Sequence, residues 1–231
     1  AEDLQGVHAR KLKARYYGTI SFIDHCLGRL LDAVAARPDA DNTLIAFFAD
    51  HGEHLGDHHA WHMDGFFDSS CRIPFLLSWP ARLPANQVRQ ELVSLVDLFG
   101  IACHAAGAPE AREGVDLLAI LAGAQPPRQH QIGMQGWPGQ RGFKVMVRTQ
   151  RWKYIYLANG AREQLFDLVA DPHELSNLAE LHAEPRQALR QVAIAACRTP
   201  GAADALAGDD LKAFAFQAAP ARRIIQYDKS L

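Results

Sequence analysis

TLIAFFADHGE, residues 43–53, joins a short apolar run to a turn that carries charged side chains. The run is nearly continuous and rich in β-prone residues, which predicts a strand covered on both faces, as in a parallel sheet. Asp50 and His51 follow the run directly, so they lie at the carboxyl end of the expected strand. In open α/β sheets, this is the end at which ligands bind.

The segments on either side of this strand fit the same fold class. A helix is expected at residues 7–37, where apolar side chains recur at three- and four-residue steps. A second buried strand is expected at residues 73–79 (IPFLLSW). A helix is expected at residues 92–106, with Ser94 or Asp97 as its cap.

The pattern changes near residue 126. Four β-prone stretches separated by turn residues predict an antiparallel meander at residues 131–136, 143–149, 152–157 and 164–168. Helices are expected at residues 172–181 and 184–198. We therefore expect an α/β protein in two units. Residues 1–125 would hold part of a parallel sheet with helices, and residues 126–231 a small antiparallel sheet packed on helices.

Composition excludes several classes of protein. The chain has 231 residues, 48% of them apolar and 22% charged, which is typical of globular proteins. A net charge of −2 without a basic stripe argues against nucleic-acid binding. No apolar run approaches the ~20 residues that span a bilayer, and no signal peptide is visible. We therefore expect a protein of the cytoplasm, bacterial in type, with its four scattered cysteines reduced.

The polar loop that follows the first strand permits more than one kind of site. Asp50 and His51 suit a divalent cation, but Asp50 could equally cap the tight turn before Gly52. A zinc site is the alternative, although the loop has no HExxH order and its glycines disfavour a rigid helix. Its candidate ligands are His54, His58, His59 and His62.

Six short motifs occur along the chain: DHGE at residues 50–53, LGDH at 55–58, DSSCRIP at 68–74, RWKY at 151–154, LFDL at 165–168 and DPHE at 171–174. Together they resemble motifs of the sulfatase family of the alkaline phosphatase superfamily. The motifs occur in the family's order across most of residues 15–182. Within the family, GFFDSSCRIP is most similar to the arylsulfatase and phosphonate monoester hydrolase group.

The resemblance implies an alkaline-phosphatase-like fold and hydrolysis of sulfate esters, or of related phosphate and phosphonate esters. Family members use a divalent cation of the calcium, magnesium or manganese class. Their nucleophile is a formylglycine made from the cysteine of a C-x-[PA]-S-R motif, and its attack is assisted electrostatically. On this pattern Asp50 and His51 take metal-site positions.

Two departures limit what the resemblance carries over. No C-x-[PA]-S-R motif occurs, and the family's amino-terminal acidic ligands have no counterpart, so only the carboxyl-terminal half is matched. Met63 stands where the family places a lysine that reaches the sulfate, and a thioether cannot replace an ammonium as donor. The adjacent His62 is the one candidate substitute, and no other catalytic residue is assigned.

Three hypotheses follow. The chain is the carboxyl-terminal portion of a sulfatase-type hydrolase, inactive alone because the formylglycine belongs to a missing half; or a non-catalytic relic that binds a metal or a partner; or a zinc enzyme. An incomplete sheet exposes strand edges and apolar surface, so we expect a homo-oligomer.

Overall fold

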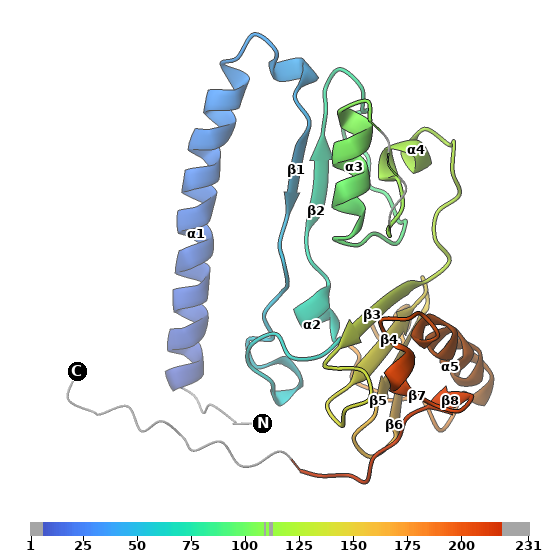
Figure 1. The fold of residues 1–231 in the computed structure, drawn as a ribbon. Coiled ribbons are helices and arrows are strands. Elements are labelled where there is room, and N and C mark those ends of the chain that lie inside the picture. Colours follow the sequence, from blue (N-terminus) through green and yellow to red (C-terminus); the bar gives the residue numbers. More distant parts are fainter. Residues whose placement is uncertain (1–6, 109, 111–112, 219–231) are drawn as a thin grey trace.

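The computed structural model describes residues 7–108, 110 and 113–218. Its first helix, α1 (Val7–Ala35), confirms the helix predicted at residues 7–37. None of its described side chains is buried, and large apolar residues such as Tyr17 and Phe22 are more than half exposed. Figure 1 shows α1 standing apart from the strands, so its apolar stripe has no cover among the described residues.

The strands β1 (Ile45–Phe48) and β2 (Phe75–Ser78) lie where strands were predicted, but they pair antiparallel with each other. The expected parallel sheet is therefore wrong for the residues that the structure describes. The expectation of cover on both faces is wrong as well. Phe47 and Leu76 face each other across the ladder and remain 39% and 57% exposed.

The other face of this strand pair is buried. Phe75 and Leu77 pack on a cluster that includes Trp79, with α3 (Asp97–Ala105) and α4 (Leu117–Leu121) supplying the rest. Asp97 does not cap α3 through its side chain; it is fully buried and accepts hydrogen bonds from the amides of Ser94 and Val115. The short helix α4 was not predicted; Asp116 caps it by accepting from two backbone amides of its first turn.

The predicted antiparallel meander is confirmed. The strands β3 (Gln131–Gln135), β4 (Lys144–Arg148), β5 (Trp152–Leu157) and β6 (Arg162–Asp167) form one sheet in sequence order. One face packs on α5 (Ala183–Cys197), which confirms the last predicted helix. The core between them is formed by Val145, Val147, Tyr154, Tyr156, Leu165, Leu189, Ala193, Ile194 and Cys197.

The helix predicted at residues 172–181 is wrong, because polar side chains satisfy this backbone as a series of turns. Asn177 accepts from the amides of Leu165 and Ala179, and Asp171 accepts from the amide of Ser176. The remaining elements are short: 3-10 turns at Ala40–Asn42, Asp57–His59 and Ala203–Ala205, the helix α2 (Asp68–Cys71), and the hairpin of β7 (Leu206–Ala207) and β8 (Asp210–Leu211).

The second face of the four-stranded sheet carries the loop that follows β1. Met146, Ile155 and Phe166 form a small buried cluster on which Phe66 and Phe67 pack. The loop is thereby fixed to residues more than 75 positions later in the chain. The division into units at residues 125 and 126 stays a prediction. No described helix is both long enough and apolar enough to cross a membrane.

Candidate functional site

The turn after β1 places a carboxylate beside an imidazole. Asp50 Oδ1 accepts a hydrogen bond from the amide of His51 at 2.9 Å, which orients its second oxygen. The Nδ1 atom of His51 lies 2.8 Å from the carbonyl oxygen of Gly52, and a carbonyl only accepts. Nδ1 therefore carries a proton, and Nε2 lies 3.6 Å from Asp50 Oδ2.

This pair has the donor chemistry of a divalent-cation site. A carboxylate oxygen and an imidazole nitrogen, both common metal-ligand atoms, lie near each other. Ligand distances of about 2.3–2.6 Å, typical of calcium, accommodate two donor atoms 3.6 Å apart at roughly a right angle. Both side chains are well exposed, so further ligands can approach. Asp50 and His51 fit two ligand positions of the cation that the family resemblance implies, but they supply only part of a site, because no group of three or more His, Cys, Asp or Glu among the described residues could hold a metal ion.

The zinc prediction is wrong. Among the residues that the structure describes, which include the whole loop, no group of three or more His, Cys, Asp or Glu could hold a metal ion. Both ring nitrogens of His54 are used, Nδ1 by Ser69 Oγ at 2.7 Å and Nε2 by the Asp64 carbonyl at 3.0 Å. His58 stacks on Phe67 with ring centroids 3.7 Å apart. The left-handed backbone at residue 58 prevents the helix that would align these rings.

Met63 lies at the site and His62 lies beside it. Met63 lines the same cavity as Asp50 and His51, and its carbonyl accepts from Ser70 Oγ at 2.7 Å. His62 is not among the residues that line this cavity; its backbone amide donates to Glu53. The substitution of His62 for a lysine at this position stays a prediction.

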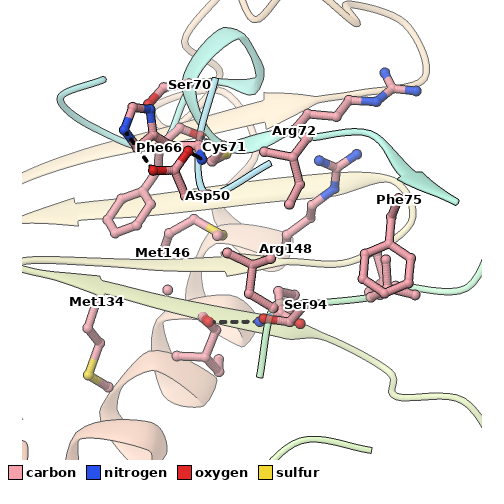
Figure 2. Close-up of a pocket in the computed structure, with 18 of the residues that line it drawn as sticks. Asp50, Phe66, Ser70, Cys71, Arg72, Phe75, Ser94, Met134, Met146 and Arg148 are labelled. Atoms are coloured by element: carbon pink, nitrogen blue, oxygen red, sulfur yellow. Dashed lines mark hydrogen bonds and ion pairs between the residues drawn. The ribbon is translucent and has the colours of Figure 1, made fainter. Parts of the chain in front are cut away.

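Figure 2 shows the cavity, which has a volume of about 650 Å³. It lies between the segment from Met63 to Phe75, the segment 89–95 and the strands β3 and β4. Asp50 lies at one end, and Arg72 and Arg148 line it further along (Figure 2). The guanidinium groups of both arginines lie within 4 Å of Asp68, and Arg72 is largely exposed. The wall therefore offers donors to an anionic group.

Cys71 also lines this cavity, but it does not have the properties of a nucleophile. Burial raises the pKa of the Cys71 thiol, and this outweighs the opposing effect of the Lys153 ammonium. Its Sγ atom lies 3.1 Å from the carbonyl oxygen of Phe66. A protonated, hydrogen-bonded thiol does not attack an ester, because the thiolate is the reactive form.

The sequence reasoning gave no role to the residues behind the cavity. Lys153 and Glu174 are buried and converge on Asp68. Their motifs, RWKY and DPHE, were noticed only as elements in the expected order. A lysine inside an expected strand was the available signal, because a buried ammonium requires partners.

Comparisons with known proteins agree on one family. The profile described as "Sulfatase" matches residues 3–108, and that described as "N-sulphoglucosamine sulphohydrolase, C-terminal" matches residues 56–192, more than half of the chain. The choline-sulfatase of Rhizobium meliloti (strain 1021) is 32% identical over 98% of this chain and 43% of its own length. An arylsulfatase of Clostridium perfringens is 31% identical over 80% of this chain and 40% of its own.

A solved structure is also similar to this chain. The phosphonate monoester hydrolase of Agrobacterium radiobacter superposes with a TM-score of 0.72 at 29% identity, covering 84% of this chain and 42% of that one. The chain thus spans less than half the length of these relatives. The chain belongs to the sulfatase family of the alkaline phosphatase superfamily.

Proposed function

We propose that this chain forms the carboxyl-terminal portion of a sulfatase-type hydrolase of sulfate, phosphate or phosphonate esters. Asp50 and His51 would contribute two ligands to its divalent-cation site. The observation that carries the proposal is the 3.6 Å distance from Asp50 Oδ2 to Nε2 of His51, just after β1. Family membership supports the reaction class.

In the complete site, a bound cation would supply electrostatic stabilisation to an oxoanion. Asp50 and His51 would provide two of its ligands. Arg72 and Arg148 present guanidinium donors to the same cavity, where they can bind negatively charged oxygens of a substrate. Met63 supplies no proton and no charge, which distinguishes this site from the lysine-bearing pattern of the family.

The remainder of the site would come from polypeptide that this sequence does not contain. The sequence holds no C-x-[PA]-S-R motif for a formylglycine, and it covers less than half of its relatives. Among the described residues, no segment covers the outer face of β1 and β2 or the apolar stripe of α1, as expected if further strands lie between them. We predict that the 231-residue chain alone hydrolyses aryl sulfates negligibly and self-associates through these surfaces.

Cation binding is the direct test. We expect CaCl2, MgCl2 or MnCl2 to raise the thermal unfolding midpoint of the chain, because a ligand that binds only the folded state stabilises it. Asp50→Asn should abolish this shift, whereas Asp57→Asn, an exposed carboxylate of the same loop, should preserve it. An unchanged shift in Asp50→Asn would exclude the proposed site. Light scattering that shows only monomers would exclude self-association.

A non-catalytic relic that binds a metal or a partner is the second candidate. Met63 in place of the lysine favours it, because that exchange removes a charge-assisted donor from the oxoanion position. Restored turnover on adding polypeptide that contains a C-x-[PA]-S-R motif would decide for the hydrolase. Cation binding without any such complementation would decide for the relic.

A further inference from the structure

A buried ammonium lies behind the candidate site. Lys153 is on β5, its side chain is fully buried, and it projects from the sheet face opposite α5. Its Nζ atom forms ion pairs with Asp68 and, at 2.6 Å, with Glu174, and donates to the carbonyl of Phe66 at 2.9 Å. The ammonium therefore donates hydrogen bonds to Asp68 and to Phe66, and a second carboxylate, that of Glu174, lies against it as an ion-pair partner. An ammonium without these partners would not remain charged at this depth.

The partners of Lys153 come from different parts of the chain. Asp68 is the first residue of α2, whereas Glu174 belongs to the turns after β6 and is 3% exposed. A second oxygen of Glu174 accepts from the backbone amide of Asp68. Arg148 on β4 adds an ion pair to Asp68 at 2.9 Å. Three segments thus converge on the start of α2, and we call Lys153, Asp68, Glu174 and Arg148 the α2 clamp.

The helix α2 in turn fixes the turn that carries the candidate metal residues. The amide of Gly52 donates to the carbonyl of Ser70 at 2.6 Å. The approach is so close that a Cβ atom at residue 52 would lie 2.3 Å from the carbonyl oxygen of Ser69. Ser70 Oγ also donates to the carbonyl of Met63. One turn of helix therefore sets the backbone on two sides of the cavity.

We propose that the α2 clamp is a positioning device that couples the carboxyl-terminal sheet to the cation site. Lys153 and Glu174 do not line the cavity, so they act on it only through Asp68 and α2. The sheet offers an apolar contact to Phe66 and an ionic one to Asp68, and both fix the same segment. This inference rests on the proposed function, because the residues that the clamp positions, Asp50 and His51, are the cation ligands of that function.

The test is a charge-balanced double variant, Lys153→Met with Glu174→Gln. It removes one positive and one negative charge, and it leaves the ion pair of Asp68 with Arg148 in place, so the chain can still fold. The matched control is Arg151→Met with Asp167→Asn. That pair, 2.8 Å apart at the edge of the same sheet, makes no hydrogen bond or ion pair with α2 in the part of the chain that the structure describes.

Amide hydrogen exchange is the readout, followed for residues 50–54 and 66–72 and, as internal reference, for α5. We expect the double variant to lose protection in the first two segments by about tenfold or more, with α5 unchanged and the control like wild type. Unchanged protection at 50–54 would overturn the proposal. Equal loss in all segments would also overturn it, because the clamp would then serve only global stability.

Cation affinity gives a second readout on the same variants. We expect the affinity for Ca2+, measured calorimetrically, to fall in the double variant and to stay constant in the control. If wild type binds none of the cations tested, the proposed function fails, and hydrogen exchange still decides the role of the clamp. A double variant with lost protection at residues 50–54 but wild-type affinity would overturn the coupling.

Discussion

Gly52 is the point where the candidate site touches α2, and Gly52→Ala is the sharpest perturbation of that contact. The new Cβ atom would lie 2.3 Å from the carbonyl oxygen of Ser69 and 3.2 Å from that of Ser70. These neighbours are backbone atoms, so no side chain can move aside. Either α2 or the turn has to shift by about 1 Å to reach an ordinary van der Waals distance.

Two contributions set the size of the effect. Overpacking of a closely packed contact typically costs about 1–3 kcal/mol. The hydrogen bond from the Gly52 amide to Ser70, 2.6 Å long, has a net value of about 0.5–1.5 kcal/mol and is lost or lengthened. We therefore expect a loss of about 2–4 kcal/mol in the free energy of unfolding. Cation affinity should fall as well, because the turn moves.

Urea denaturation followed by tryptophan fluorescence measures the first effect, and calorimetric titration with CaCl2 the second. Gly28→Ala is the matched control, because a Cβ atom there meets nothing within 4 Å in the middle of α1. It should leave cation affinity unchanged and favour the helix by up to about 1 kcal/mol. A Gly52→Ala protein within about 0.5 kcal/mol of wild type, with wild-type affinity, would refute the proposed contact.

Three further predictions concern other parts of the molecule. Burial raises the pKa of Asp116, but the hydrogen bond from His104 and the amides of α4 outweigh it, so the pKa lies below its usual range. This contribution to stability is complete above the unfolded pKa of about 3.9 and is lost as pH falls through the folded pKa. In urea titrations from pH 6 to pH 2, Asp116→Ala should be less stable by about 1 kcal/mol at pH 6 and should show less of this loss. Iodoacetamide at pH 8 should label the exposed Cys26 rapidly and Cys197 only after unfolding, because burial raises the pKa of Cys197 to about 11; equal labelling rates in the native protein would contradict its burial. Met63→Lys should strengthen calorimetric binding of inorganic sulfate, since it adds a charge-assisted donor to the cavity, and an unchanged affinity would show that this position does not reach the anion.

The elements that the sequence predicted well are those whose pattern is local. The meander at residues 131–168 alternates strands with turn residues, and each strand is paired with its neighbour along the chain. The helix α5 begins and ends within one residue of the helix predicted at residues 184–198. The turns at residues 171–177 were missed because Asp171 and Asn177 bond to the backbone, which periodicity does not reveal.

The candidate site was predicted only in part, because only some of its residues are indicated by a local pattern. Asp50 and His51 were identified because they follow a strand directly, which is local information. The α2 clamp was not identified from the sequence, because Lys153 and Asp68 are 85 positions apart. The strand pattern of the meander does not indicate which residues pack on its second face. The zinc hypothesis failed because the number of histidines says nothing about where their ring nitrogens point, and those of His54 are already used.

The two faces of the four-stranded sheet differ in chemistry, and the difference explains what each one does. The face toward α5 is apolar and close-packed, with Val145, Val147 and Leu165 fully buried, as expected of a core that stabilises the fold. The opposite face combines a small apolar cluster with Lys153 and Arg148. A buried ion-paired lysine adds little net stability compared with an apolar side chain of similar volume. The lysine instead fixes the relative positions of segments, because an ammonium between two carboxylates allows few arrangements of the segments that carry them. A sheet that served only as a core would need no such residue on its second face. Lys153 pairs with Asp68 in α2, and Gly52 bonds to Ser70 of the same helix. This link is the reason to assign the second face of the sheet a role in positioning the candidate site.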